Sequence, residues 1–80
     1  MRYRRLQGFL HAHGLYQEDV ADLLGISVSS VSRRYRAIEP WRVDEMYALL
    51  DAVEAPYSQM SVLFPRGGIE SDLSDLRKRA

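Results

Sequence analysis

The sequence predicts one all-α domain built from five short helices, and three observations lead to this fold class. Apolar residues recur at intervals of three and four along most of the chain, which is the spacing of one helix face. Glycine and proline residues interrupt this pattern at short intervals, as they do between helices. No segment alternates apolar and polar residues for long enough to form a strand. Eighty residues suffice for one such domain but not for two.

The first two helices are expected over residues 3–13 and 17–24. In the first, apolar and aromatic side chains recur at i, i+3, i+4 and i+7, which places them on one face. The second begins with acidic residues, and the helix dipole stabilises negative charge in a first turn. Gly14 and Gly25 follow the two helices, and glycine ends helices because it adopts a positive φ at little cost.

A third helix is expected at about residues 28–35, with Ser27 as its N-cap, because a serine hydroxyl accepts a hydrogen bond from the first turn. Only three or four residues then separate it from the second helix, and one of them is Gly25. Two helices joined by so short a glycine-containing turn form a helix-turn-helix. We expect Val31 to bury against Ala21, where the two helices cross closely.

The remaining apolar pattern predicts a fourth helix over residues 43–54 and a fifth at about residues 57–63. Pro56 suits the turn that starts the fifth helix, because proline lacks the N–H that a first turn leaves unpaired. Beyond the fifth helix, proline and glycine residues end the apolar pattern. We therefore expect one helix-turn-helix domain over residues 1–65 and a flexible, mobile tail over residues 66–80.

Charge is distributed unevenly along a chain whose formal net charge is zero. Residues 1–36 have a net charge of +3, residues 37–65 of −4 and residues 66–80 of +1. The overall balance argues against a polybasic nucleic-acid binder, whereas the basic first part leaves room for a local basic face. Ten of the eleven basic residues are arginine, whose planar guanidinium suits phosphates and guanine edges.

Composition excludes several other classes of protein. The chain has no cysteine, so disulfides and thiolate metal sites are excluded. It has neither a signal-peptide pattern nor the run of about 20 apolar residues that crosses a membrane, so we expect a soluble cytoplasmic protein with no membrane partner. His11 and His13 point apart on a helix, which leaves no metal site. We also expect no catalytic residues, no cofactor and no small-molecule ligand.

The segment from Gln17 to Arg33 carries a specific motif, QEDVADLLGISVSSVSR. It resembles the helix-turn-helix of the phage Cro/repressor-like family of the XRE type, whose pattern is Q-x-x-x-A-x-x-L-G-[IV]-S-x-S-x-[VIL]-S-[RK], and every specified position matches. The resemblance implies a five-helix, repressor-like DNA-binding fold. The sequence departs from the family at Tyr16, Ala37 and Arg42, where a capping Thr or Ser, a glycine and a second capping Thr or Ser are common.

The resemblance also implies which side chains contact double-stranded DNA. The outward stripe of the helix at 28–35 would enter the major groove, where an arginine can pair with guanine O6 and N7. The implied base-contacting residues are Val28, Ser29, Ser32 and Arg33. The implied phosphate-contacting residues are Gln17, Ser27, Arg36 and Arg42.

Simpler interpretations of the arginines stay open. An arginine cluster on a helix is often only a solvated face. Arg34 points about 100° away from Arg33, so its expected partner is the first helix or a flanking phosphate. The arginines near the N-terminus are either solubilising charge or contacts to flanking DNA, and these are Arg2, Arg4 and Arg5.

These patterns predict a sequence-specific DNA-binding transcriptional regulator, and the resemblance points to a repressor from a prophage or other mobile element. We expect a homodimer on a roughly palindromic operator, with half-sites one helical turn, about 34 Å, apart. The acidic segment 37–65 leaves a second hypothesis open, that of a protein-interaction module such as an antitoxin or anti-regulator. A toxin-like neighbouring reading frame, or a partner complex that survives high salt, would favour this second function.

Overall fold

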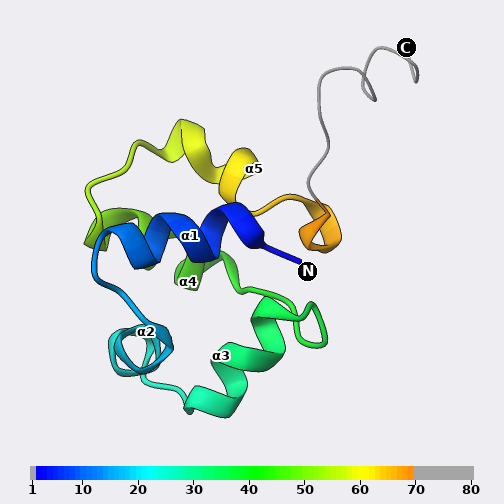
Figure 1. Ribbon diagram of the computed structural model, residues 1–80. Helices are drawn as coiled ribbons and strands as arrows, with labels where there is room; N and C mark the ends of the chain where they lie inside the picture. Colours follow the sequence, from blue (N-terminus) through cyan, green and yellow to red (C-terminus); the bar gives the residue numbers. More distant parts are fainter. Residues whose placement is uncertain (1, 70–80) are drawn as a thin grey trace.

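The computed structural model describes residues 2–69, and within them every regular element is helical (Figure 1). The all-α class and the expected number of α-helices are confirmed for this part of the chain. Within the same residues, no helix has the length and apolar character that spanning a bilayer requires. The elements are α1 (Arg4–Ala12), α2 (Gln17–Leu24), α3 (Val28–Tyr35), α4 (Val43–Ala52), the 3₁₀ helix η1 (Tyr57–Gln59), α5 (Met60–Leu63) and the 3₁₀ helix η2 (Arg66–Gly68).

α2 and α3 have the predicted limits, whereas the other helices are shorter than expected. α4 ends at Ala52 rather than at residue 54, because Glu54 adopts a φ of 56° and turns the chain. The expected fifth helix divides into η1 and the four-residue α5. Its first turn after Pro56 closes as a 3₁₀ turn, in which the Gln59 N–H donates to the Pro56 carbonyl at 3.0 Å.

The four longer helices all end in the same way. A residue in the left-handed conformation follows each helix, and the next N–H donates to the carbonyl five positions earlier, as in a Schellman motif. Two of these residues are the predicted glycines, Gly14 and Gly25. The other two are Ala37 and Glu54, with φ of 60° and 56°. A residue with a Cβ loses about 1–2 kcal/mol in this conformation, so packing beyond the helices must hold these two turns.

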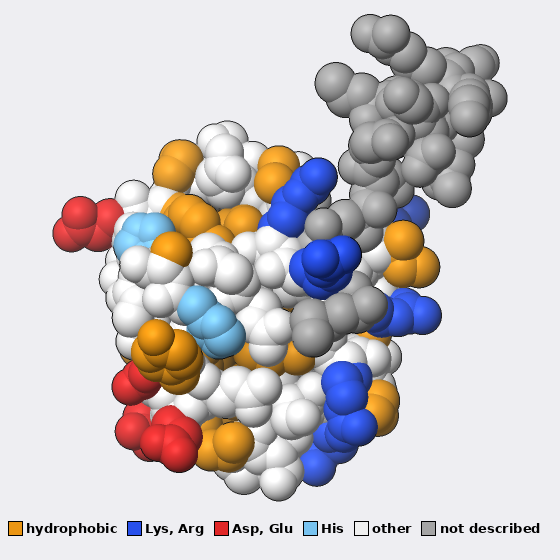
Figure 2. Space-filling model, in the orientation of Figure 1, with side chains coloured by type: hydrophobic (Ala, Val, Ile, Leu, Met, Phe, Trp, Pro, Cys, Tyr) orange, Lys and Arg blue, Asp and Glu red, His pale blue; other side chains and the backbone are white. Residues whose placement is uncertain are grey.

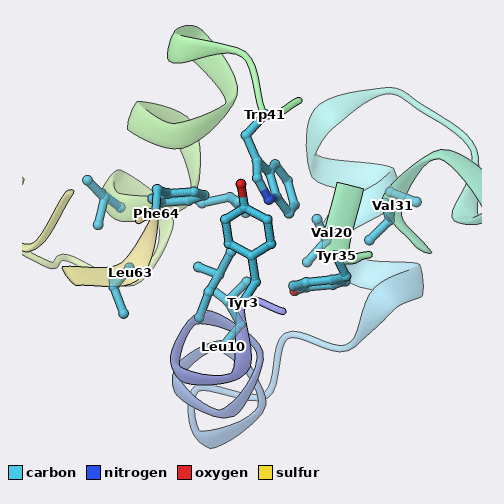
Figure 3. Close-up of a cluster of buried hydrophobic side chains, with 12 residues drawn as sticks. Tyr3, Leu10, Val20, Val31, Tyr35, Trp41, Leu63 and Phe64 are labelled. Atoms are coloured by element: carbon cyan, nitrogen blue, oxygen red, sulfur yellow. The ribbon is translucent and has the colours of Figure 1, made fainter. Parts of the chain in front are cut away.

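An aromatic cluster at the centre of the molecule joins the helices (Figure 3). The Trp41 ring meets three other aromatic rings edge to face, and each such pair contributes about 0.5–1.5 kcal/mol beyond the area it buries. The ring centroids of Tyr3, Tyr35 and Phe64 lie 6.2, 5.4 and 5.6 Å from that of Trp41. The fully buried aliphatic side chains around the cluster are Leu6, Leu10, Val20, Val31, Leu49 and Leu50.

η2 packs against the N-terminus, although its residues fall in the expected tail. Two hydrogen bonds run from the Tyr3 N–H to the Gly68 carbonyl (3.0 Å) and from Arg2 Nη1 to the Gly67 carbonyl (2.6 Å). Gly68 is buried, and a Cβ at this position would lie 2.6 Å from the Tyr3 ring. The packed region thus continues past the predicted boundary at residue 65. The rest of the expected tail, residues 70–80, lies outside the described residues.

Candidate nucleic-acid interface

α2 and α3 pack against each other across the short turn that the sequence predicts. Gly25 has a φ of 68° at the end of α2. The Ser27 hydroxyl accepts a hydrogen bond from the Ser30 N–H at 3.1 Å, which confirms the predicted N-cap of α3. Ala21 and Val31 are both buried, 4% and 0% exposed, as close packing of the two helices requires. The short turn between α2 and α3, and the packing of the two helices, therefore follow from local sequence chemistry.

α2 and α4 begin without the capping Thr or Ser that is common in the family the motif resembles. In α2, the Asp19 carboxylate accepts a hydrogen bond from the Tyr16 N–H at 2.9 Å. In α4, the Glu45 carboxylate accepts one from the Arg42 N–H at 3.0 Å. An acidic side chain at the third helical position thus supplies half of a capping box in both helices.

An open hollow of about 500 Å³ lies between α1, α2 and α3. Three residues implied as DNA contacts line it: Gln17 at the start of α2, and Ser32 and Arg36 from α3 and its end. The other lining residues are Arg2, Gln7 and Tyr35. Sequence reasoning missed Gln7, because its place depends on how α1 lies against α2 and α3, which no local pattern records. Among the described residues, the lining contains no carboxylate.

The other implied contacts do not line this hollow. Val28 and Ser29 are exposed at the start of α3, and the exposed apolar side chain of Val28 suits a thymine methyl group. The Ser27 hydroxyl is engaged as the cap of α3. Arg42 lines a separate hollow between α2 and α4, and its Nε lies 3.5 Å from the Asp44 carboxylate. Gln17, Ser32 and Arg36 therefore share the hollow, Ser29 lies one turn from Ser32 on α3, and Arg42 lines a different hollow.

Arg33 is paired within the protein rather than extended into solvent. Its Nε donates to Glu39 Oε1 at 2.5 Å, and its Nη2 donates to the Ser30 hydroxyl at 3.0 Å. The side chain is still 39% exposed, so part of the guanidinium faces outward. Glu39 stands in the loop after α3, six residues from Arg33, and helical spacing alone does not reveal this pair.

Arg34 turns inward and joins α3 to α4. Its Nε and Nη2 donate to the two carboxylate oxygens of Glu45 at 2.9 and 3.0 Å, and both residues are buried. The expected partners, the first helix or a flanking phosphate, are therefore wrong, because α4 supplies the partner. A bidentate pair that is shielded from water holds its arginine in place, so Arg34 serves the packing of two helices.

Charge separates across the face of the molecule drawn in Figure 2. Arginine side chains of the described residues lie over the right-hand part of this face, from the end that carries α3 to the region of the N-terminus. Asp and Glu side chains lie along the opposite edge. The neutral total therefore conceals a basic edge that begins at the predicted DNA-reading helix.

Tyr35 adds a neutral donor to the hollow. Burial raises the pKa of its phenol to about 12, because the charged form loses its hydration there. The hydroxyl is protonated at physiological pH, as an unperturbed tyrosine also is, and burial extends this to higher pH. A neutral donor beside Arg36 suits an anion, whereas a phenolate would repel it.

The two histidines take part in local contacts. His13 Nδ1 lies 2.9 Å from the Phe9 carbonyl, and the His11 ring packs against Tyr16 with centroids 4.9 Å apart. Across residues 2–69, no group of three or more metal-ligating side chains is arranged to hold an ion.

Comparison with protein-family models, with curated proteins and with solved structures finds no match for this chain. What the surface binds therefore has to follow from its own chemistry. Two features carry that inference: the hollow that contains Gln17, Ser32 and Arg36, and the exposed start of α3 beside the turn.

Proposed function

We propose that this protein is a sequence-specific DNA-binding regulator of transcription that inserts α3 into the major groove and holds the DNA backbone at the hollow beside it. The observation that carries the proposal is the hollow itself, where Gln17, Ser32 and Arg36 line one surface. These residues come from two different helices. Their meeting depends on the crossing of α2 and α3 and not only on spacing along one helix.

The lining of the hollow suits a phosphate group. Arg2 and Arg36 supply two guanidinium groups, which pair with phosphate oxygens in a planar fork. α2 begins at Gln17, and the N–H groups of a first helical turn favour an anion in front of them. The neutral donors of the lining are the side chains of Gln7, Gln17, Ser32 and Tyr35. A phosphate at this place fixes the position of α3 on the duplex, as backbone contacts do in DNA complexes.

The size and exposure of α3 suit base recognition. An α-helix such as α3 is about 10–12 Å in diameter with its side chains, and a major groove about 12 Å wide admits it. Val28 and Ser29 are exposed at the N-terminal end, the part that helix-turn-helix proteins place against base edges. The outward part of the Arg33 guanidinium adds a donor group for guanine.

The proposal includes a homodimer on DNA, because one small module buries little surface on a duplex. Exposed apolar side chains on α4, η1 and α5 are the proposed contact, and they are Tyr47, Tyr57 and Val62. The resemblance of the motif to phage repressors extends the proposal to repression. Selected sites that overlap a promoter would support that extension.

The test is selection of bound duplexes from a random pool by the full chain, followed by titration of the best duplex across a salt series. We expect two symmetry-related half-sites about 34 Å apart and an affinity that falls steeply with salt. Failure to enrich any sequence would contradict the proposal. A complex with another protein that persists at high salt, after DNA is released, would support the interaction module instead.

A further inference from the structure

We propose that Glu39 is a positioning residue for DNA recognition, which holds Arg33 in one orientation so that its guanidinium reads a guanine. The inference rests on the proposed function and adds a residue outside the helix-turn-helix motif. Glu39 lies in the loop between α3 and α4, and its carboxylate contacts two arginines of α3.

The carboxylate of Glu39 contacts Arg34 as well as Arg33. One oxygen accepts the Arg33 Nε hydrogen bond at 2.5 Å, and the other lies 3.5 Å from Arg34 Nη1. Arg34 is fixed by its two buried hydrogen bonds to Glu45. Carboxylates and guanidinium groups thus alternate from α4 to the outer face of α3, in the order Glu45, Arg34, Glu39 and Arg33.

The loop backbone places Glu39 beside the residue that it holds. The N–H groups of Ile38 and Glu39 both donate to the Arg33 carbonyl, at 2.9 and 3.3 Å. Ala37 turns the chain with a φ of 60°, which brings these two N–H groups back to the end of α3. The backbone of Glu39 is therefore hydrogen-bonded to that of Arg33, which brings the Glu39 side chain within reach of the Arg33 guanidinium.

Arg33 keeps donors for DNA in this arrangement. A guanidinium carries five N–H donors, of which Glu39 and the Ser30 hydroxyl each take one. Three donors remain on the two terminal nitrogens, and two donors suffice for guanine O6 and N7. Because the side chain is already ordered in the unbound protein, less rotamer entropy is lost on binding. Glu39 thus fixes the orientation of the Arg33 guanidinium and leaves enough of its N–H donors available for a guanine.

A repelling charge is the competing role for Glu39, since a carboxylate near a duplex also weakens binding to phosphates. The two roles differ in one measurable quantity, the ratio of affinities for duplexes that differ at a single base pair. A repelling charge changes affinity for every duplex alike, whereas a positioning residue changes this ratio at the guanine that Arg33 contacts.

The experiment uses the full chain and the best duplex selected from a random pool, together with versions in which each G·C pair is replaced by A·T. In the unmodified protein we expect one guanine whose replacement weakens binding about tenfold or more, an effect that Arg33→Ala abolishes. Glu39→Asp keeps the charge but shortens the reach, and should reduce this ratio severalfold. Glu39→Gln keeps the reach and an acceptor oxygen without the charge, and should retain most of the ratio.

Two controls complete the experiment. Glu54→Ala removes the same charge at an exposed position at the end of α4, and should leave the ratio unchanged. In the Arg33→Ala background, Glu39→Asp should have no further effect on the ratio, because the two residues act as a unit. Circular dichroism checks that each variant is folded.

The inference is overturned if Glu39→Asp leaves the single-guanine ratio unaltered, or if its effect persists undiminished in the Arg33→Ala background. A uniform gain in affinity for all duplexes with Glu39→Gln, together with an unaltered ratio with Glu39→Asp, would overturn it in favour of a charge effect. Failure to select any duplex is a different outcome, because it overturns the proposed function and removes the inference with it.

Discussion

Two regions of this small molecule are held together by different means. The region of α2, the turn and α3 follows local sequence chemistry: Gly25 ends one helix, Ser27 caps the next, and both helices have their predicted limits. The region after α3 uses Ala37 and Glu54 where glycine is favoured, and its helices differ from prediction. The first region specifies its own shape, whereas the second depends on contacts made across the fold.

The comparison also explains the charge distribution. Two acidic residues of the second region pair with arginines of the first: Glu45 holds Arg34 inward, and Glu39 holds Arg33 on the outer surface. Arg36 is exposed and, within residues 2–69, forms no ion pair, which leaves it for an anion in the hollow. The three neighbouring arginines therefore have three different environments, with Arg34 buried in an ion pair, Arg33 paired at the surface and Arg36 exposed.

The largest expected effect comes from cutting the buried link between the two regions. Arg34→Ala leaves the Glu45 carboxylate buried without its bidentate partner, and should lower the free energy of unfolding by about 3–5 kcal/mol. Urea denaturation measures this loss. The matched control is Arg34→Met combined with Glu45→Leu, which removes both charges and should cost only about 1 kcal/mol, because the Arg42 N–H loses its acceptor. A loss below about 1 kcal/mol for Arg34→Ala would mean that the pair does not join the regions.

A smaller loss is expected at the contact between η2 and the N-terminus. Gly68→Ala places a Cβ 2.6 Å from the Tyr3 ring at a φ of 72°, and should destabilise the fold by about 1–3 kcal/mol. Gly8→Ala, in the middle of α1 with nothing within 4 Å of the added Cβ, should instead stabilise it by about 0.5–1 kcal/mol. Thermal unfolding of both variants measures the contrast. An equal change in Tm for both variants would show that η2 does not contribute to the stability of the packed region.

The smallest effect is expected at the helix ends. Ala37→Gly relieves a left-handed residue at the end of α3 and should raise stability by about 0.5–1 kcal/mol, after the greater freedom of glycine in the unfolded chain is counted. Gly25→Ala makes the opposite change at the end of α2 and should lower stability by about 1 kcal/mol. Denaturant titrations measure the change in the free energy of unfolding for each variant. Changes of opposite sign would support the difference between the two regions. A loss of stability with Ala37→Gly would contradict it.

The sequence was sufficient for the parts of the fold that short-range chemistry decides. The apolar spacing located four of the five α-helices to within a few residues, and Gly14, Gly25 and Ser27 marked their ends. The motif and the family that it resembles also singled out Gln17, Ser32 and Arg36, which meet at the hollow. Each of these predictions depends on residues no more than about twenty positions apart.

Other features depend on residues far apart in the chain. Gly68 reads as the end of the packed region, yet it meets Tyr3 across 65 positions of sequence in a contact that only the folded chain creates. Glu39 reads as loop charge, because its contact with Arg33 requires the turn at Ala37. Gln7 reads as a surface residue of the first helix, because its neighbours in the hollow come from two other helices.

The central claim is that the region of α2 and α3 presents Arg36 to a DNA phosphate while neighbouring arginines serve other roles. The most direct test is the slope of log affinity against log salt for the selected duplex, with Arg66→Ala as the matched control because Arg66 is exposed in η2 and does not line the hollow. Arg36→Ala should reduce the slope by about 0.9, the value for one phosphate contact, while Arg66→Ala leaves it unchanged. An unchanged slope for Arg36→Ala, or an equal reduction for both variants, would contradict the account.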